Sequence, residues 1–524
     1  MKLLRHFAGL LVIASTLTAQ GPGVLRNENA TVGLAAASRP APTWAEQVAP
    51  IIFKNCTECH RPGQGAPFDL LTYEDASKRS KMISVVTGSH TMPPWHPDPK
   101  VQSFRDARVL TPDEVKVLSD WSEAGAPAGD LTRAPAPPKF PADGWRLGTP
   151  DVVVTMAQPF PVPAAGTDIY RSFVLPLALP EDKYVRAVEM RSTAPSVVHH
   201  VLYFLDSTGA ARKRKSRDNK PGFGGIGVRG FTGGLGGWAV GATPAFLPDG
   251  LALELPKGSD LILQAHLHPS GTPESVSFTI GLYFAKQKPA KKLFAFQSPR
   301  LFGALAGLVI PAGKKDHAIK GSFVVPVDVD LVGVGGHAHY LAHRMEAIAE
   351  APDGTKTPLF RINDWDFNWQ GQYEYLKPIR VKAGTRIRSI ITYDNSADNP
   401  ANPSNPPKRV RFGEETTDEM GSITFRCVAV NLKDEPLLDE VIRSELAGSS
   451  LGGSDQRPEG LRDPKQLMDR FKQMDTNRDG FLEIGEWPED FGMITDFIDA
   501  DSDGKLSVEE IRGLSQLRGR RFGN

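Results

Sequence analysis

Short, β-prone runs separated by glycine, proline and aspartate turns fill the sequence from about residue 145 to about residue 435. No part of this region has the spacing of a long helix, and such runs are typical of antiparallel β-sandwiches. Because the region is longer than one sandwich needs, we expect two, joined near residues 309–313. The predicted strands lie at residues 151–156, 184–190, 197–204, 261–266, 276–284, 324–334, 386–393 and 422–430.

The composition supports this interpretation and excludes others. The chain has 524 residues with 50 glycines and 44 prolines, which favours turn-rich β structure over helical bundles. Its 61 basic and 61 acidic side chains cancel, so the charge balance does not indicate binding of nucleic acid or of an anionic membrane. A hydrophobic content of 40% is enough for buried cores, and the length indicates several domains.

The N-terminus, residues 1–19, has the pattern of a secretory signal peptide. It combines a basic start, a short apolar run at residues 8–14 and a small residue, Ala19, before a plausible cleavage point. The apolar run is too short to span a membrane comfortably, and no other stretch approaches the necessary length. We therefore expect an exported protein, periplasmic or extracellular, with no integral membrane segment after the signal is cleaved.

Two of the three cysteines belong to a Cys-x-x-Cys-His motif, Cys56, Cys59 and His60, which is the attachment signature of c-type haem. Two thiols three residues apart on a helical turn can each form a thioether to the porphyrin, and the histidine supplies the proximal imidazole. The alternatives are a redox-active cysteine pair or half of a zinc site. The zinc alternative would need a second Cys-x-x-Cys motif, and the sequence has none. The third cysteine, Cys427, has no partner, so the chain is disulfide-poor and this thiol is expected to be buried.

The distal haem ligand is expected downstream in the same small module. Met92 is the candidate, because it supplies a thioether on a proline-stiffened loop. His90 and His96 flank it and are the competing candidates. Methionine and histidine together raise the haem potential, which suits a carrier that accepts and passes single electrons.

A helix is predicted to begin at Pro112, with Thr111 as its N-cap, and to be amphipathic. With the haem motif before it, the segment at residues 41–130 resembles a small all-α cytochrome c. The proline-rich residues that follow, 131–145, are predicted to be a linker.

The region of predicted strands contains histidines at positions that could bind metal ions. His199 and His200 are adjacent on a predicted strand, and because neighbours on a regular strand face opposite ways, a shared metal requires a bulge or twist there. His266 ends another predicted strand, and His268, two residues on, is its competitor as a third ligand. Three histidines alone could also form a zinc site.

A second set lies in the later half, where the glycine-rich stretch Gly333–Met345 carries His337 and His339. Residues two apart on a strand point to the same face, so both imidazoles can reach one metal ion. His343 is not expected to bind the metal; it should either face solvent or contact the ligands without touching the ion. Farther along, residues 417–420 read Thr-Asp-Glu-Met and end in Met420.

This order of motifs resembles the copper type II, ascorbate-dependent monooxygenases, the family of peptidylglycine hydroxylating monooxygenase and dopamine β-monooxygenase. The resemblance covers roughly residues 146–433. In that family a His-His pair and a Gln-x-His histidine bind one copper, and a His-x-His pair with an Asp-Glu-Met methionine binds the other. The resemblance implies a copper site one of His199, His200 and His266 and a copper site two of His337, His339 and Met420.

The resemblance also implies a fold and a reaction. It implies two jelly-roll-like β-sandwich domains, at residues 146–310 and 311–435, and hydroxylation of a substrate C–H bond with dioxygen at the second site, His337, His339 and Met420. Imidazole holds both oxidation states of copper, whereas a thioether favours Cu(I). The three-histidine site would store an electron. The alternative is a copper-free sandwich that has kept its histidines.

The sequence departs from the peptide-amidating branch of that family. Two residues that help to hold the peptide there, an arginine and a tyrosine, are replaced here by Gly335 and Thr424. A glycine-extended peptide is therefore not implied, and the substrate is an unidentified small molecule or peptide-like compound. Animal members also carry several disulfides in these halves, whereas this chain has only Cys427 there.

After a Gly/Ser-rich linker at residues 440–464, two repeats in residues 465–524 fit the EF-hand calcium loop. Their starts are 24 residues apart (499 minus 475), a tight spacing that resembles short bacterial EF-hand repeats. The alternative is an acidic, solvated tail, but such a tail would not repeat the glycine and the terminal glutamate of the calcium loop in both repeats. The predicted ligands of the two calcium ions are Asp475, Asn477, Asp479, Phe481 and Glu486 in the first loop and Asp499, Asp501, Asp503, Lys505 and Glu510 in the second.

These features together predict an exported copper monooxygenase fused to its own haem electron donor, with a calcium module behind it. The haem would receive electrons from an external donor, either a redox protein or a small reductant. A second hypothesis is a secreted electron-transfer or copper-binding protein without hydroxylase activity. A third is a surface-attachment protein whose main function lies in the calcium repeats.

Overall fold

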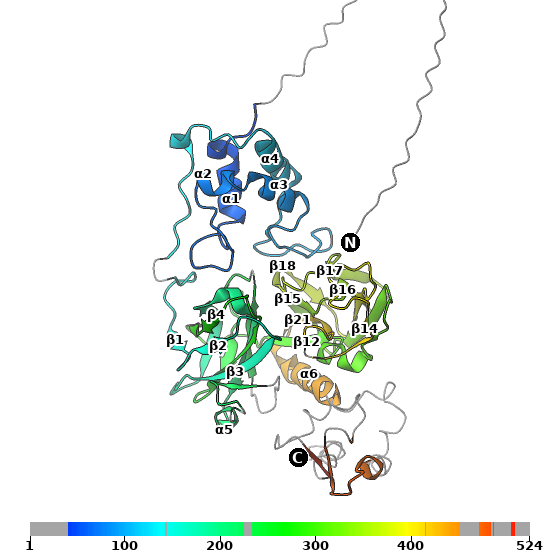
Figure 1. Cartoon of the computed structure of the whole chain (residues 1–524). Helices are drawn as coiled ribbons and strands as arrows, with labels where there is room; N and C mark the ends of the chain where they lie inside the picture. Colours follow the sequence, from blue (N-terminus) through cyan, green and yellow to red (C-terminus); the bar gives the residue numbers. More distant parts are fainter. Residues whose placement is uncertain are drawn as a thin grey trace, which may run out of the picture. The chain divides into compact units, whose positions relative to one another are not determined.

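The structure, a computed structural model, is mostly β-sheet, arranged in several sheets with few helices (Figure 1). The chain divides after Ala41 into two units, and every element below belongs to the second, Pro42–Asn524. The predicted signal peptide, residues 1–19, lies outside the described residues, as does most of the linker expected at residues 440–464. The structure describes residues 40–141, 144–214, 216, 218–224, 233–240, 242–413, 415–449, 471–483, 486 and 505–508.

The first part of the described chain is a helical module. Its helices are η1 (Trp44–Val48), α1 (Ala49–Asn55), α2 (Tyr73–Ser77), α3 (Ser80–Gly88), α4 (Pro112–Glu123) and η2 (Leu131–Arg133). The predicted helix is confirmed as α4: the Thr111 hydroxyl accepts the amide N–H of Glu114, and the Glu114 carboxylate accepts that of Thr111. This capping box satisfies two amides at the helix start. Trp44 and Trp121 pack in the core, with ring centroids 6.3 Å apart.

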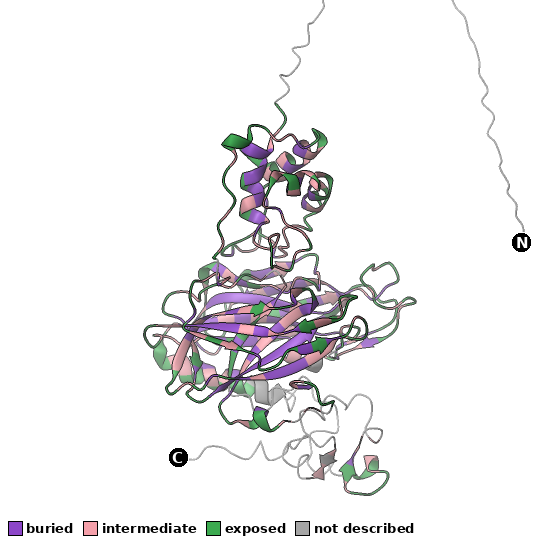
Figure 2. Ribbon diagram, turned by 60° about the vertical axis from the view of Figure 1, so that its left-hand side comes forward, coloured by how far each residue is buried: buried purple, intermediate pink, exposed green. Residues whose placement is uncertain are grey.

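The first β half, residues 145–284, consists of antiparallel sheets around one core. Its elements are β1 (Val152–Thr155), β2 (Phe160–Val162), β3 (Ile169–Pro176), β4 (Lys183–Ser192), η3 (Pro195–Val197), β5 (Val198–Asp206), α5 (Ala210–Lys213), β6 (Phe223–Gly224), β7 (Gly233–Ala239), β8 (Leu253–Leu255), β9 (Asp260–Leu267), β10 (Glu274–Val276) and β11 (Phe278–Phe284). The sheet orders are β1-β11-β4-β8, β6-β3-β9-β5-β7 and β10-β2. Side chains from both larger sheets, such as Leu263 and Ile280, meet in the core. Figure 2 shows buried stretches, in purple, along the strands of the sheets.

The second β half, residues 294–449, repeats this organisation around a separate core. Its elements are β12 (Phe294–Ser298), η4 (Leu301–Ala306), β13 (Val309–Ile310), β14 (His317–Val324), β15 (Val329–Ala338), β16 (Ala342–Glu350), β17 (Lys356–Ile362), β18 (Gln372–Val381), β19 (Arg386–Tyr393), β20 (Val410–Arg411), β21 (Gly421–Ala429), η5 (Leu432–Asp434) and α6 (Glu435–Ser449). The sheet orders are β12-β21-β15-β18, β14-β19-β16-β17 and β13-β20. Phe425 on β21 and Ile391 on β19 meet between the larger sheets.

Two boundaries differ from the sequence expectation. The run predicted as one strand at 324–334 is divided between β14 and β15, because Pro326 lacks an amide N–H and cannot continue the pairing. Between the two strands, Asp328 accepts the amide N–H of Ala383 at 2.8 Å. The second core also begins before the joint expected at residues 309–313, since β12 already pairs with β21.

The end of the second β half is helical where a linker was expected. Helix α6 occupies the first part of residues 440–464 and buries Leu438 and Ile442 in the core. Cys427 on β21 is fully buried in the same core, as expected, and burial raises the pKa of its thiol to about 12. It therefore behaves as a small apolar side chain.

A segment between α3 and α4, residues 93–106, leaves the helical module and lies against the second β half; we call it the strap. Its backbone bonds to both β17 and β18. Near its end Phe104 is 7% exposed and stacks on Tyr375 with ring centroids 5.3 Å apart, inside the second core. The backbone hydrogen bonds run from the Asp98 amide to the Arg361 carbonyl (2.8 Å), from the Arg105 amide to Glu374 (2.8 Å) and from the Leu376 amide to Ser103 (2.9 Å).

The last described elements, β22 (Phe481–Leu482) and β23 (Leu506–Ser507), pair antiparallel and join the two repeats near the C-terminus. In the sequence, each strand comes after the glycine of its predicted calcium loop. Among the residues that the structure describes, no helix is long and apolar enough to cross a membrane.

Candidate metal centres

Three histidines of the first β half converge. His199 and His200 lie at the start of β5 and His266 lies near the end of the neighbouring strand β9. The pairing of β5 with β9 shifts in register between Val198 and His200, which is the irregularity that two adjacent ligands require. One nitrogen from each imidazole lies within 4.8 Å of the others.

The spacing of these nitrogens suits a metal ion. His200 Nδ1 is 3.1 Å from His199 Nδ1 and 3.4 Å from His266 Nδ1. Nitrogens about 2.0–2.1 Å from one ion in tetrahedral directions are about 3.3 Å apart. Burial, reinforced by the neighbouring imidazoles, lowers the pKa of His199 to about 3 and the pKa of His200 well below its usual value. The rings are therefore neutral at pH 7 and can offer lone pairs.

Asp168 orients the third histidine. Its carboxylate, 5% exposed, accepts from His266 Nε2 at 3.0 Å and from His268 Nδ1 at 2.6 Å. Burial opposes ionisation of Asp168, but hydrogen bonds from His266, His268 and Thr416 prevail and hold its pKa well below its usual value. The bond at Nε2 leaves His266 Nδ1 facing the cluster. His268, 62% exposed, lies outside the cluster, which favours His266 over it as the third ligand.

The second pair of histidines is held in the same way. His337 is the last residue but one of β15 and His339 follows the strand, with ring centroids 5.5 Å apart. His337 Nδ1 donates to Gln370 Oε1 at 2.6 Å, and His339 Nδ1 donates to the Asp418 carbonyl at 3.2 Å. In both rings this leaves Nε2 as the nitrogen with a free lone pair. Burial lowers the pKa of His337 to about 4 and that of His339 to about 3.

Met420 lies at the start of β21, beside this pair. Strand β15 pairs with β21 up to Ala338 opposite Gly421, so His339 and Met420 are the next residues along the two strands. Met420 is 8% exposed, and its carbonyl accepts from the Tyr393 hydroxyl at 3.0 Å. The strand register thus brings the predicted thioether ligand to the end of the sheet that carries the histidines.

Glu419 anchors the same turn from the inside. Its carboxylate is fully buried and accepts the amide N–H groups of His339 at 3.4 Å and Leu341 at 3.2 Å. Burial raises the pKa of Glu419 well above its usual value. The residue ties the backbone after His337 to the backbone before Met420.

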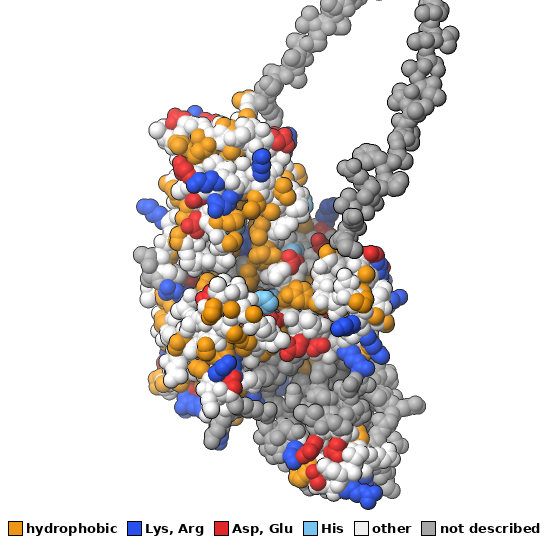
Figure 3. Space-filling view, viewed as in Figure 1, with side chains coloured by type: hydrophobic (Ala, Val, Ile, Leu, Met, Phe, Trp, Pro, Cys, Tyr) orange, Lys and Arg blue, Asp and Glu red, His pale blue; other side chains and the backbone are white. Residues whose placement is uncertain are grey.

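The two histidine sets face each other across the two β halves. The ring centroids of His200 and His337 are 6.3 Å apart. Phe367 lies between the sets, stacked on His199 at 4.2 Å and 5.8 Å from His339. Figure 3 shows that some histidine side chains reach the surface amid hydrophobic ones. Phe367, itself 5% exposed, thus places an apolar ring between the two sets.

The predicted haem ligands lie at the end of α1. The amide of His60 donates to the Cys56 carbonyl at 3.0 Å, which places Cys56, Cys59 and His60 on one turn. His60 Nδ1 donates to the Phe68 carbonyl at 3.0 Å, leaving Nε2 free for an axial position. Burial, with the nearby Cys59, raises the pKa of the Cys56 thiol to about 12, and neither thiol is in a disulfide.

The candidates for the distal ligand occupy different environments. Met92 is half-buried on the loop after α3, and its amide donates to the Val86 carbonyl at 3.0 Å. His90 is exposed. His96 lies on the strap, and its Nδ1 is bonded at 3.1 Å to the Asp364 carbonyl of the second β half.

The first calcium loop is pre-shaped. Asp475 accepts the amides of Asp479 at 3.1 Å and Gly480 at 3.0 Å, and Gly480 has φ +85°, a conformation that favours glycine. Glu486 folds back and accepts the amide of Asn477 at 3.1 Å. Phe481, predicted to ligate through its carbonyl, follows on β22. Of the second loop, Lys505 is described, whereas Asp499, Asp501, Asp503 and Glu510 lie outside the described residues.

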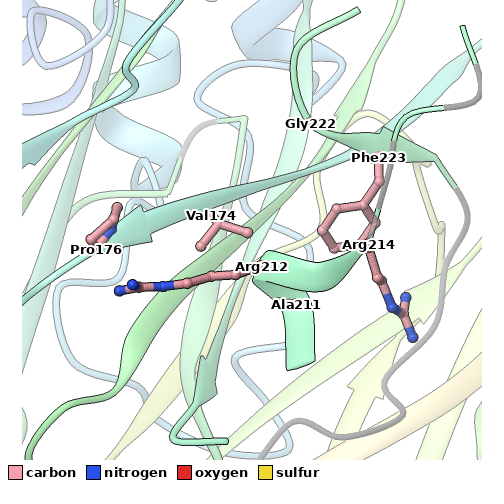
Figure 4. A pocket seen from close by; sticks show the side chains of 7 residues that line it. All are labelled: Val174, Pro176, Ala211, Arg212, Arg214, Gly222 and Phe223. Carbon is pink, nitrogen blue, oxygen red and sulfur yellow. The ribbon is translucent and has the colours of Figure 1, made fainter. Parts of the chain in front are cut away.

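A separate hollow in the first β half carries no such chemistry (Figure 4). Arg212, which lines it, is paired with Asp260 through bonds of 2.5 and 2.6 Å. Neither histidine nor cysteine lines it. The lining residues are Val174, Pro176, Ala211, Arg212, Arg214, Gly222 and Phe223.

Sequence reasoning missed the residues that orient the ligands. Asp168, Gln370 and Phe367 belong to no motif and lie far along the chain from the histidines they contact. Trp365, whose indole N–H donates to the His339 carbonyl at 3.2 Å, was also missed. Only a tertiary structure brings such partners together.

Comparison with known proteins identifies the C-terminal module. Residues 467–489 and 496–515 match the EF hand family, so this module is an EF-hand pair of the calcium-binding kind. No curated protein matches the chain.

Among solved structures, the chain is 9% identical to PNGF-II, with a TM-score of 0.23, covering 53% of this chain and 65% of that one. It is 11% identical to the major capsid protein P2 of bacteriophage PM2, with a TM-score of 0.22, covering 53% and 98%. A peptide-N(4)-(N-acetyl-β-D-glucosaminyl) asparagine amidase is 9% identical, with a TM-score of 0.25, covering 53% and 96%.

Proposed function

We propose that this protein is an exported, copper-dependent monooxygenase that hydroxylates a substrate C–H bond with dioxygen and receives electrons through its own c-type haem. One observation carries the proposal. In both histidine sets a hydrogen-bond partner holds the far side of the ring, as Asp168 does for His266 and Gln370 does for His337. Such support is typical of histidines that ligate a metal.

The donor atoms fit copper. Imidazole binds copper in both oxidation states, and a thioether at the second set favours Cu(I) and disfavours zinc. Bound copper would supply one-electron redox chemistry and the activation of dioxygen. The first ion would be held by His199, His200 and His266 and the second by His337, His339 and Met420.

The surrounding residues prepare the sites for such ions. Asp168 and Gln370 fix which nitrogen of each ring is available, and Glu419 holds the backbone on both sides of the second set. The depressed histidine pKa values keep the rings neutral, so no proton has to leave before a metal binds. Phe367 places an apolar ring between the sets.

The haem belongs to the same proposal. Cys56 and Cys59 would form the thioethers, His60 would be the proximal ligand, and Met92 is the candidate distal ligand. The finer fold assignment is also proposed: an all-α cytochrome c module at residues 41–130 and two jelly-roll-like sandwiches. An external redox protein or small reductant would supply the electrons, and the protein would work in the periplasm or outside the cell.

The test is metal content and oxygen uptake of protein matured in a haem-attaching periplasm. We expect two coppers and one haem per chain, and uptake that is lost in Met420→Ala. The matched control is Met82→Ala, which removes a methionine that is 52% exposed in the helical module and should leave uptake intact. Zinc or no metal in the β halves would overturn the proposal. Uptake indifferent to Met420→Ala would instead favour an electron carrier or copper-binding protein without hydroxylase activity.

A further inference from the structure

We propose that the strap and the 363–371 loop form the path by which electrons pass from the haem to the second histidine set. The inference rests on the proposed function, because it assigns a route between two groups that the function requires. It goes beyond that function by naming the residues through which the two modules communicate: His96, Asp364 and Trp365.

The path begins at the predicted distal ligand. Met92 immediately precedes the strap, and four residues later His96 bonds through Nδ1 to the Asp364 carbonyl at 3.1 Å. Four residues of extended chain span at most about 14 Å. The haem-side loop is thus connected to the second β half by a short covalent segment and one hydrogen bond.

The path continues within the 363–371 loop. Trp365 is the neighbour of Asp364, is 7% exposed, and donates its indole N–H to the His339 carbonyl at 3.2 Å. Its own amide donates to the His343 carbonyl at 2.8 Å, so its backbone and its ring are both held. Two hydrogen bonds and otherwise covalent bonds therefore connect Met92 with His339.

The same loop reaches the rest of the site. Gln370 near its end accepts from His337, and Phe367 at its centre stacks on His199 of the first β half. The loop therefore contacts both members of the second pair and one member of the first set. A loop that only closed off the core would not need to contact all three imidazoles.

The strap is fixed firmly enough to keep this connection in place. Asp98 is held by the Arg361 carbonyl and by the Asn363 side-chain amide at 3.1 Å, and Trp95 packs against Tyr373 with ring centroids 5.1 Å apart. These contacts lie on either side of His96 in the sequence. They hold the imidazole at the Asp364 carbonyl rather than leaving it free in solvent.

A second contact that the described residues make between the helical module and a β half offers no comparable route. Glu58, inside the haem motif, forms an ion pair with Arg146. The Arg146 amide donates to Glu189 on β4 at 2.8 Å. Strand β4 belongs to the sheet that does not carry the first histidine set, so this contact leads away from the histidines.

With haem and copper bound at these residues, the transfer would be a single-electron exchange. Ferrous haem would give one electron to a cupric ion held by His337, His339 and Met420, leaving ferric haem and a cuprous ion. An external donor would reduce the haem again, and dioxygen would be the final oxidant. The chain's residues change neither charge nor bonding in this step; they only connect the two ends.

The experiment measures the transfer directly in the full-length, haem-containing protein loaded with Cu(II). The haem is reduced by a light flash without oxygen, and its reoxidation is followed by absorbance. In the wild type we expect first-order reoxidation that is independent of protein concentration. Trp365→Phe, which keeps a buried ring but removes the indole N–H, should slow it several-fold, and so should His96→Phe.

The controls separate a route from a merely structural role. Gln102→Leu removes the bond from Gln102 to the Pro358 carbonyl (2.8 Å), which also holds the strap but lies off the route, and should leave the rate unchanged. The haem potential, haem spectrum and copper content should be the same in all variants. A change in the haem spectrum of His96→Phe would identify His96 as a haem ligand and overturn the route.

Failure of the route and failure of the proposed function look different. If haem reoxidation in the wild type is no faster with Cu(II) than with Zn(II), the proposed function fails and the route fails with it. If the wild type transfers electrons but Trp365→Phe and His96→Phe match Gln102→Leu, only the route is wrong. His96→Phe keeps the test decisive if Trp365→Phe does not fold.

Discussion

Replacing Asp168 by asparagine should weaken the first metal site without abolishing it. The carboxylate accepts from two histidines, His266 at 3.0 Å and His268 at 2.6 Å, and is 5% exposed. Asparagine has the same size but only one acceptor oxygen, and its NH2 group can only donate. One of the two imidazoles therefore loses its acceptor.

The size of the effect follows from the role of such partners. Removing a hydrogen-bond partner behind a ligating histidine typically costs about 10–100-fold in metal affinity, or about 1.4–2.8 kcal/mol. Burial of Asp168 places the expected loss toward the upper end of that range, because water cannot replace the missing acceptor. The second copper, held by residues that Asp168 does not contact, should be unaffected.

The assay is an anaerobic Cu(I) titration in competition with a chelator of known affinity, which resolves one weakened and one normal site. The matched control is Asp398→Asn, at a carboxylate that is 81% exposed and pairs with Lys315 at 2.8 Å. Such a surface pair contributes little. Equal affinities of Asp168→Asn and Asp398→Asn for both coppers would refute the role assigned to Asp168.

Two further predictions concern stability. Phe104→Ala should lower the free energy of unfolding, measured by denaturant titration, by about 3–5 kcal/mol, because it removes a ring from the second core. The control, Phe246→Ala, at a ring 36% exposed, should lower it far less. Similar losses in the two variants would mean that the strap is not part of the core. Metal-free protein should lose stability as the pH falls below about 6.5. Burial lowers the pKa of His199 to about 3 and that of His337 to about 4, so in this range the unfolded histidines bind protons and the folded ones do not. The free energy of unfolding should therefore fall by up to about 1.4 kcal/mol per pH unit for each histidine. His199→Gln should flatten the pH dependence of the denaturation midpoint, and a wild-type midpoint that does not vary with pH in this range would contradict the burial argument.

Local rules predicted the parts of this fold whose partners are close in sequence. The cap at Thr111 marked the start of α4, and strand alternation predicted that His337 and His339 share one face, although β15 ends at Ala338, before His339. The same alternation showed that His199 and His200 require an irregularity, although it could not say that the register shift comes at Val198.

Contacts between distant segments could not be predicted in this way. Asp168 lies 98 residues before His266, and Gln370 lies 33 residues after His337, with no motif to connect them. Phe104 lies in a loop whose few apolar residues show no periodicity, so nothing in the sequence assigns it to the second core. Packing decides such contacts, and it depends on the whole fold.

X-ray absorption at the copper edge of Cu(I)-loaded protein tests the central claim most directly. Copper bound by His337, His339 and Met420 predicts one sulfur ligand among nitrogen ligands, and Met420→Ala should remove that sulfur signal while Met82→Ala keeps it. Copper with nitrogen ligands only, a sulfur signal that survives Met420→Ala, or protein that binds no copper would contradict a copper monooxygenase.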